Sequence, residues 1–372
     1  MRVITARNIN HALPRAVQLF RAGLNVRRIA PRGRSTLEYM EPVATVYVQP
    51  RERVLFSPAR DANPFFHFFE SLWIMAGRAD VEWLRFFLPR ITEYSDDDFT
   101  FHGAYGARMR RAVRVAAGGW RESTNQFENV VAELHRDRNS RRAVIGLWTP
   151  ALDSGYMGKD MPCNCTLFFK LREGALNMLV ANRSNDVIWG AYGANVVQFS
   201  VIQEVLASML DASVGKYTQM SDSFHVYEDE PSWQRVLHAY GDIHNGDHYD
   251  PYTDTEVATG YGFWHPRPVD PYPLLKYPRT WFSDLDEFMS LIQSCMRGPG
   301  GEGPVYIIDT PDWKNPLFHE VAVPLFNAYV GRLCGDYDTA LRWALLCAAE
   351  DWALAAAMWI NRRAVKAQEQ KQ

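Results

Sequence analysis

Hydrophobic and polar positions follow two different periods in different parts of this chain. Over residues 125–138 apolar side chains recur every three or four positions, with Phe127, Val130 and Leu134 on one stripe, which predicts an amphipathic helix. Residues 44–49 instead alternate between apolar and polar side chains, as a half-buried strand does. The chain therefore combines both kinds of element, and we predict an α+β fold with a mixed or antiparallel sheet and long helices.

The stretch 64–77 is apolar on every side, which is typical of a buried helix. Pro64 suits the first turn of such a helix and Gly77 its C-terminal end. Glu70 is the single charged residue in the stretch. Because burying a carboxylate without a partner is costly, we expect Glu70 to have either a partner or a purpose in function.

Other parts of the chain show weaker patterns. Residues 240–275 are rich in Asp, Tyr, Pro and Gly and predict a long irregular connection. The region 316–366 is rich in Ala and Trp and is predicted to be largely helical. The further expected elements are helices over 9–22 and 194–210, a strand over 143–148, and strands over 166–171 and 176–181 joined by a hairpin turn at Glu173-Gly174.

Composition narrows the class of protein. The chain has 372 residues, of which 47% are hydrophobic, enough for a sizeable core. Its 40 Lys and Arg residues are balanced by 43 Asp and Glu residues, which argues against binding to duplex nucleic acid. No apolar run is long enough to span a membrane, and the first residues lack the apolar segment of a signal peptide. Five cysteines, an odd number, argue against a disulfide framework and for a reduced, cytoplasmic setting.

Cys163 follows Pro162 at the edge of a predicted strand, and a cysteine at such a position is a candidate nucleophile. A lone cysteine is also often just a small buried apolar residue. Cys165 lies two residues further on, but no second cysteine pair or histidine pair at ligand spacing accompanies the two, which argues against a zinc site. The polar motifs around Cys163 favour the nucleophile.

Several motifs occur in a fixed order on both sides of Pro162-Cys163. This order resembles that of thymidylate synthase and the related pyrimidine nucleotide hydroxymethylases, over about residues 30–230. The spacing from Cys163 to Arg183 fits that family without a gap, which selects Cys163 over Cys165. The motifs that carry the resemblance are Glu70-Ser-Leu-Trp73, Tyr105-Gly106, Ser140-Arg141-Arg142, Trp148, Arg183-Ser184-Asn185-Asp186, Gly190, Asn195 and His225-Val226-Tyr227.

The resemblance implies a thymidylate synthase-like fold and a one-carbon transfer to C5 of a pyrimidine 5'-monophosphate, with 5,10-methylenetetrahydrofolate as the cofactor. Cys163 would be the thiolate that adds to C6, with its pKa lowered by nearby arginines. Glu70 resembles the carboxylate that orders water and assists proton transfer. Tyr105 would lie beside the nucleophile, and Asp186 would contact the folate or a water near the transferred carbon.

The resemblance also implies how the nucleotide is held. Arg183 and Ser184 would bind its phosphate together with Arg34, for which Arg32 is a rival because that loop is one residue out of register. Arg141 and Arg142 would reach the phosphate from the other subunit of a homodimer. Residues His225 and Tyr227 would bind the sugar hydroxyl, and Asn182 would lie near the base edge.

The base is read in this family by a residue early in the helix that follows Gly190. An ungapped register places Ala194 there, whereas a one-residue insertion places Asn195 there and aligns the apolar positions that follow. An Asn side chain can donate to O4 and accept from N3–H of uracil. We therefore favour Asn195 and dUMP, with dCMP or CMP as the alternative.

Two departures from the family bear on the product. Residues 91–99 replace a Trp-rich segment, and the chain ends in a polar stretch where thymidylate synthases have a short apolar tail. Because excluding water favours methyl formation, both departures favour hydroxymethylation of dUMP over synthesis of dTMP. An authentic thymidylate synthase and a catalytically silent homologue that binds nucleotide or RNA are the other candidates.

The resemblance divides the chain into two parts. Residues 1–288 are expected to form the thymidylate synthase-like catalytic domain, and residues 289–372 a helical C-terminal extension. The tryptophans of the extension are expected to serve packing rather than binding; they are Trp343, Trp352 and Trp359.

Overall fold

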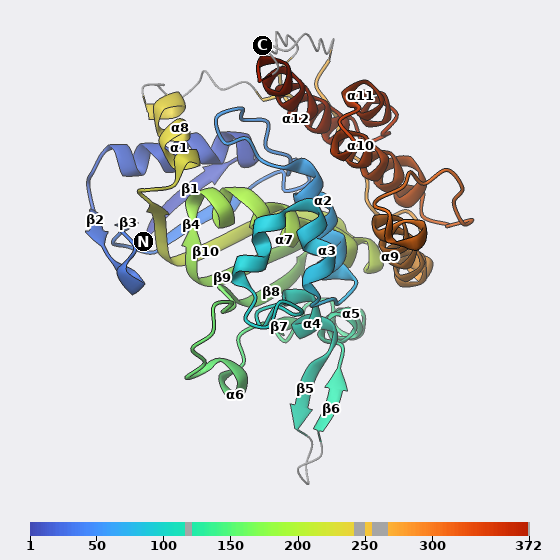
Figure 1. Cartoon of the computed structure of the whole chain (residues 1–372). Helices are drawn as coiled ribbons and strands as arrows, with labels where there is room; N and C mark the ends of the chain where they lie inside the picture. Colours follow the sequence, from blue (N-terminus) through green and yellow to red (C-terminus); the bar gives the residue numbers. More distant parts are fainter. Residues whose placement is uncertain (116–120, 242–249, 255–266, 371–372) are drawn as a thin grey trace.

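The computed structural model describes residues 1–115, 121–241, 250–254 and 267–370 (Figure 1). Strands and helices alternate irregularly along these residues. The strands are β1 Arg2–Ala6, β2 Val26–Ile29, β3 Thr36–Tyr39, β4 Val43–Tyr47, β5 Ala112–Val115, β6 Arg121–Thr124, β7 Val144–Gly146, β8 Asn164–Arg172, β9 Ala175–Asp186 and β10 Ser213–Tyr227. The α-helices are α1 Ile9–Arg21, α2 Pro64–Met75, α3 Val81–Phe87, α4 Tyr105–Arg110, α5 Gln126–Arg136, α6 Pro150–Asp153, α7 Asn195–Met209, α8 Pro231–Gly241, α9 Trp281–Arg297, α10 Val323–Leu333, α11 Tyr337–Leu345 and α12 Glu350–Glu369.

A mixed sheet forms the centre of the molecule. Its main path runs β1-β4-β10-β9-β8-β7, and β3 pairs with both β10 and β2. The pairs β1–β4 and β10–β9 are parallel, whereas β4–β10, β9–β8 and β8–β7 are antiparallel. Helices α7, α2 and α3 lie over one side of this sheet (Figure 1). The expected α+β architecture with a mixed sheet and long helices is confirmed.

The β8–β9 hairpin turns where the sequence predicted. Glu173 and Gly174 both have left-handed backbones, with φ of 51° and 76°, as the two-residue turn between right-twisted strands requires. The expected strand over 143–148 is shorter, and only Val144–Gly146 pair. It ends early because the N–H groups of Leu147 and Trp148 both turn to the carbonyl of Cys165, where the register of β8 shifts.

The helix expected over 194–210 begins with an irregular turn. A π-helical segment, Val187–Ala194, precedes α7, and within it Tyr192 and Gly193 leave helical geometry. A wider turn of this kind accommodates one additional residue in a helix. The inserted residue inferred from the sequence is therefore taken up before Asn195, which stands at the first position of α7.

The C-terminal extension packs against α2. Ring centroids of Phe68 and Trp352 lie 5.2 Å apart and those of Phe65 and Trp359 5.5 Å apart, with both tryptophans buried. These contacts confirm that Trp352 and Trp359 serve packing; Trp343 is half-buried against the same core. Helix α9 runs through the expected boundary between residues 288 and 289, so the two parts of the chain share a helix.

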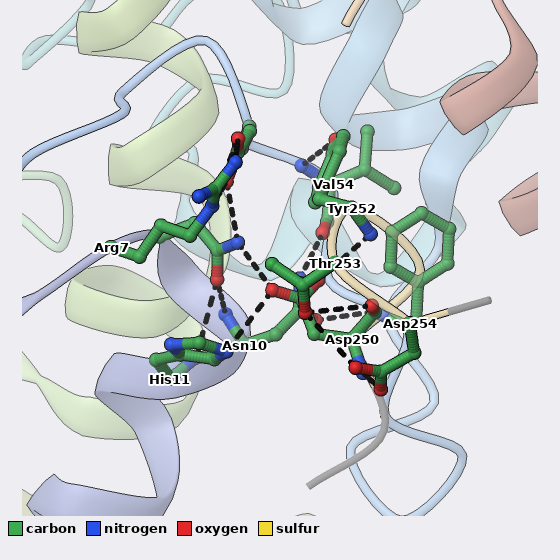
Figure 2. Close-up of polar contacts among 11 residues, drawn as sticks. Arg7, Asn10, His11, Val54, Asp250, Tyr252, Thr253 and Asp254 are labelled. Atoms are coloured by element: carbon green, nitrogen blue, oxygen red, sulfur yellow. Dashed lines mark hydrogen bonds and ion pairs between the residues drawn. The ribbon is translucent and has the colours of Figure 1, made fainter. Parts of the chain in front are cut away.

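The connection expected over 240–275 is described only in part, since residues 242–249 and 255–266 lie outside the described residues. Its central segment, 250–254, is held by buried polar contacts, most of them visible in Figure 2. The Asp250 carboxylate accepts from Asn8 Nδ2 at 2.6 Å and lies 3.2 Å from His11 Nε2. Tyr252 donates to Asp351 Oδ2 of α12 at 2.9 Å. The segment therefore ties the start of α1 to the extension.

The two faces of the sheet differ in exposure. The row Ile145–Leu167–Val180–Gln219–Thr45 is buried under the helices. The neighbouring row points to the opposite face and is exposed or half-buried at every position. That row consists of Val144, Phe168, Leu179, Thr218, Val46 and Thr5, each opposite the next across adjacent strands. One side of the sheet thus presents apolar side chains to the surface.

Replacing Trp352 by Ala tests how firmly the extension is bound to the catalytic part. The substitution removes the edge-on contact with Phe68 and leaves a cavity, so the free energy of unfolding should fall by about 3–5 kcal/mol. Thermal and denaturant unfolding measure this change. Leu346→Ala is the control, because Leu346 is 65% exposed and its truncation should cost little. A Trp352→Ala variant as stable as that control would contradict the packing described here.

Candidate active site

Cys163 is the last residue of the loop that leads into β8. The Arg183 side chain on β9 contacts both this loop and the Cys163 thiol. Arg183 donates from Nε to the carbonyl of Pro162 at 2.9 Å and from Nη2 to that of Met161 at 3.2 Å. The same Nη2 lies 3.8 Å from Cys163 Sγ, and the Arg183 backbone N–H donates to the Cys163 carbonyl. One arginine therefore fixes the loop and faces the thiol.

Burial raises the pKa of the Cys163 thiol, and the opposing effect of the Arg183 guanidinium is smaller. The expectation of a pKa lowered by several arginines is therefore wrong for a single protomer. The physical reason is that loss of solvent around the Cys163 thiol destabilises the thiolate more than the Arg183 guanidinium stabilises it. The ligand-free protomer holds Cys163 as a thiol at neutral pH.

Three polar side chains adjoin the nucleophile. The Tyr105 hydroxyl donates to Asn164 Oδ1 at 3.1 Å, which places Tyr105 beside Cys163 as predicted from its position in the chain. Tyr105 begins α4, and α4 lies close to α2 because Gly106 has no side chain; a Cβ there would be 2.2 Å from the Ile74 carbonyl oxygen. Asn195 Nδ2 donates to Asn185 Oδ1 at 3.0 Å and lies 3.5 Å from Asn164 Oδ1.

Glu70 lies inside the molecule on α2, next to α7. Burial raises its pKa to about 8, partly offset by a hydrogen bond with Gln198. Its Oε2 atom is buried without a hydrogen-bond partner among the described residues. Gln198 stands three positions after Asn195 on α7, so both side chains lie on the same side of that helix. Glu70 has no basic partner within ion-pair distance in the described part of the chain, which leaves a neutral carboxyl at pH 7.

Asp186 caps the irregular turn before α7. Its Oδ1 accepts from the backbone N–H groups of Ile188 and Trp189, whereas Oδ2 is buried without a partner among the described residues. Burial raises the pKa of Asp186 despite those hydrogen bonds. The neighbouring Trp189 ring lies 4.7 Å from the Arg60 guanidinium and 3.8 Å from that of Arg90. An aromatic surface and two cations therefore stand beside this carboxylate.

The candidate sugar residues lie together at the end of β10. The rings of His225 and Tyr227 are 5.4 Å apart, as expected for alternate positions on one face of a strand. The Arg34 guanidinium lies 3.8 Å over the Tyr227 ring and pairs with Asp229 at 3.0 Å. The side chain of the rival Arg32 lies outside the described part of the structure.

The remaining predicted residues differ in burial, from the buried Asn182 to the exposed pair Arg141 and Arg142. Asn182 is 3% exposed, and neither its Oδ1 nor its Nδ2 has a partner among the described residues. Ser184 is half-buried opposite Ser223 on β10. Arg141 and Arg142 lie exposed just before β7, and the contacts of the described residues do not bring them to Cys163. Contacts and strand pairing in the described structure thus link Arg183, Tyr105 and Asn182 to Cys163 or its neighbour Asn164, but do not link the two arginines to it.

Sequence reasoning missed three polar residues that touch this group. Asn164 directly follows the nucleophile, Gln198 follows Asn195 by one helical turn, and Gln219 lies buried in the middle of β10. Helical spacing from Asn195 could have indicated Gln198. The other two needed the strand register. No group of three His, Cys, Asp or Glu residues in the described part of the chain could hold a metal ion.

The site offers buried polar atoms without partners among the described residues, close to the Cys163 sulfur. Buried polar atoms without partners are rare in proteins and mark places where a ligand supplies the missing hydrogen bonds. Five residues near Cys163 carry such atoms in the described structure; they are Glu70, Asn164, Asn182, Asp186 and Gln198. All five cysteines are free thiols. No helix of the described residues is long and apolar enough to cross a membrane.

Known proteins with similar sequences identify the family of this chain. The sequence profile of thymidylate synthase matches residues 63–237. A deoxyuridylate hydroxymethyltransferase of Pseudomonas phage M6 is 39% identical over 370 residues, covering 98% of this chain and 95% of that protein. A protein of the same name from Bacillus phage SP01 is 36% identical, covering 72% of this chain and 69% of that protein. A putative thymidylate synthase of Methanosarcina acetivorans is 32% identical, over 37% of this chain and 57% of its own length.

The profile match spans Glu70, Cys163 and the elements from α2 through β10 that carry them, and the phage M6 relative covers 98% of this chain. The family expected from the motifs is thereby confirmed. The chain belongs to the thymidylate synthase superfamily, together with the phage deoxyuridylate hydroxymethyltransferases.

Proposed function

We propose that this protein is a transferase that hydroxymethylates C5 of dUMP. The observation that carries the proposal is the likeness, over nearly the whole chain, to a phage deoxyuridylate hydroxymethyltransferase, combined with the Cys163–Arg183 arrangement. The product would be 5-hydroxymethyl-dUMP, a precursor for modified phage DNA. The five free thiols fit a reducing compartment, so we place the reaction in the cytoplasm.

Cys163 would begin the reaction by adding to C6 of the base. The thiolate is the reactive form, so Cys163 would lose its proton before the attack, and the Arg183 guanidinium 3.8 Å from the sulfur would favour the ionised form. The new S–C6 bond converts the ring into an enolate whose C5 is nucleophilic. Arg183 holds the loop on which the sulfur stands, so the attack begins from a fixed position.

Glu70 would manage the proton at O4 and C5. Its carboxyl is neutral below about pH 8 and has an oxygen without a partner in the described structure, so it can donate a proton or hold a water. After water has added to the exocyclic carbon, breaking the S–C6 bond would release the Cys163 thiolate and restore the C5=C6 double bond of the base. The hydroxyl oxygen of the product comes from water that adds to the exocyclic carbon.

The residues present fit a folate cofactor. Asp186 Oδ2 is buried without a partner in the described structure, and Trp189 with Arg60 and Arg90 stands beside it. These side chains would hold an aromatic, acidic molecule. When bound, 5,10-methylenetetrahydrofolate supplies one carbon at the oxidation level of formaldehyde.

Hydroxymethylation rather than methylation follows from the access of water. The segment that replaces a Trp-rich stretch of the synthases is polar and open, with Phe99 76% exposed and Tyr94 53% exposed. Helix α12 packs on α2 through Trp352 and Trp359. Because a wet site favours addition of water to the exocyclic carbon, these features support the hydroxymethyl product.

We also propose that the enzyme is a homodimer in which Arg141 and Arg142 act on the partner's nucleotide. Both arginines are exposed in the protomer, away from Cys163. The uncovered face of the sheet offers an interface, since Phe168, Leu179 and Val144 stand side by side on it. A second copy with the same face would bury this apolar row by two-fold symmetry.

Offering each nucleotide with methylenetetrahydrofolate and weighing the product tests the proposed reaction. Hydroxymethylation of dUMP adds one CH2O unit, whereas synthesis of dTMP adds one CH2 unit. We expect the CH2O product with dUMP, little turnover with dCMP or CMP, and no turnover of the Cys163→Ser variant. The Cys165→Ser variant is the matched control and should remain active. A CH2 product would replace the proposal by authentic thymidylate synthesis.

Glu70→Gln tests the proton-transfer role through two opposite effects. Turnover should fall by roughly 10²–10⁴-fold, because the amide cannot transfer a proton. The free energy of unfolding at neutral pH should rise in the variant. Burial raises the pKa of Glu70 from 4.5 in the unfolded chain to about 8, so the wild-type protein loses stability as the pH increases between these two values, and a glutamine does not titrate. Wild-type turnover should decline above about pH 8 as Glu70 ionises, and the variant should lack this decline.

The control for this experiment is Glu128→Gln on the exposed side of α5, which should change neither property. A Glu70→Gln enzyme that keeps wild-type turnover would show that another group transfers the proton.

Mixing two inactive variants tests whether the arginines act across subunits. A dimer of one Cys163→Ser chain and one Arg141→Ala/Arg142→Ala chain contains one complete site only if the arginines act in trans. Random exchange of subunits should then restore about one quarter of wild-type activity. Mixing Cys163→Ser with Glu70→Gln is the control and should restore nothing. No recovery with the arginine variant would place both arginines outside the partner's site.

A further inference from the structure

Four buried side-chain amides form a continuous chain of hydrogen bonds beside Cys163. They come from β8, β9, β10 and the start of α7, and each is 7% exposed or less. The four residues are Gln219, Asn185, Asn195 and Asn164. A buried amide group can face either way in principle, so the direction of this chain decides which atoms remain for a ligand.

A backbone carbonyl fixes the direction. Gln219 Nε2 lies 2.7 Å from the Ala191 carbonyl oxygen, which can only accept, so the Gln219 amide nitrogen must stand there. Gln219 Oε1 consequently faces Asn185 and accepts from its Nδ2 at 3.2 Å. Asn185 Oδ1 in turn accepts from Asn195 Nδ2 at 3.0 Å. Each amide therefore sets the orientation of the next.

Side contacts support the same orientation. Tyr47 donates its hydroxyl hydrogen to the Ala191 carbonyl and accepts from Gln219 Nε2 at 3.1 Å. Ser221 Oγ accepts the second Asn185 amide hydrogen at 2.9 Å. Reversing any one amide would place two donors or two acceptors against each other in a buried site, which costs the desolvation of both groups.

The chain leaves one defined acceptor and one defined donor at its end. No described residue donates to Asn195 Oδ1, because the Asn195 nitrogen is turned toward Asn185 and Asn164. Asn164 turns its oxygen toward Tyr105 and Asn195, so its Nδ2 is a buried donor without a partner in the described structure. The Asn195 oxygen and the Asn164 amide nitrogen are thus the acceptor and the donor left for a ligand.

We propose that this amide chain makes the site specific for uracil, by holding Asn195 Oδ1 as an acceptor for N3–H. The inference rests on the proposed function and adds Asn185 and Gln219 as positioning residues that act through Asn195. Uracil offers a donor at N3 and an acceptor at O4, whereas cytosine offers an unprotonated N3 and an amino group. A cytosine in the same pose would set its N3 lone pair against Asn195 Oδ1 and its amino hydrogens against the amide hydrogens.

Binding of nucleotides to Cys163→Ser protein without folate tests the proposal apart from catalysis. Calorimetry with dUMP and dCMP gives the ratio of their dissociation constants. We expect a strong preference for dUMP in the Cys163→Ser background. Adding Asn185→Leu frees Asn195 to turn over, so the preference should fall about tenfold through weaker dUMP and tighter dCMP binding. Adding Asn185→Asp should retain the preference when its carboxyl is protonated, because the acid O–H then donates to Gln219 Oε1 while the other oxygen accepts from the Asn195 amide.

Two further variants separate this role from a merely structural one. Asn177→Leu lies on the same strand β9, where its Oδ1 accepts from the Lys216 N–H, and it should leave the ratio unchanged. Gln219→Leu interrupts the chain one step earlier and should lower the ratio less, since Ser221 still accepts from Asn185. The Gln219→Leu variant also provides the test of the amide chain if the Asn185→Leu protein fails to fold. An unchanged ratio in the folded variants would overturn the inference, whereas absence of any nucleotide binding would overturn the proposed function instead.

Discussion

The site depends on the grip of Arg183 on the loop before β8. The Arg183 guanidinium donates to the backbone carbonyls of Met161 and Pro162, and the Arg183 backbone N–H donates to the carbonyl of Cys163. Charge-assisted hydrogen bonds of this kind are stronger than neutral ones and resist deformation. Because Arg183 stands on β9, which pairs with β8 through a tight hairpin, the nucleophile inherits the rigidity of the central sheet. The amides, the carboxyls and the aromatic rings are arranged around a sulfur that is already fixed.

Such an arrangement is costly to fold. Glu70, Asn182 and Asp186 each keep a buried polar atom without a partner in the described structure, and every such atom opposes folding until a ligand satisfies it. Helix α7 carries two further polar side chains of the site, Asn195 and Gln198, yet the helix is buried along nearly its whole length. The offset comes from apolar packing around it, above all the aromatic side chains of α2 and of the extension. The protein thus keeps a cluster of buried polar groups next to a large hydrophobic core.

Local patterns were enough to predict much of this architecture. The apolar run around Glu70, the amphipathic stretch after residue 125 and the turn at Glu173-Gly174 depend on neighbouring residues and agree with the structure. The family spacing selected Cys163 together with Arg183, and the two side chains meet because β9, which carries Arg183, pairs with β8 directly after Cys163. Sequence could not show that burial outweighs the arginine at Cys163, since that balance depends on atoms from distant segments. The amide partners Asn185 and Gln219 likewise meet only through the strand register.

The contact between α2 and α12 has a consequence for biosynthesis. Asp61, just before α2, meets Arg363 of α12 across 302 positions of sequence. Contacts between such distant segments form late and slow the search for the native state. During translation the phenylalanines of α2 must wait for almost the whole remainder of the chain before their tryptophan partners emerge from the ribosome. A premature stop codon before α12 would therefore release a protein in which the α2 aromatic rings that pack on α12 have lost their partners.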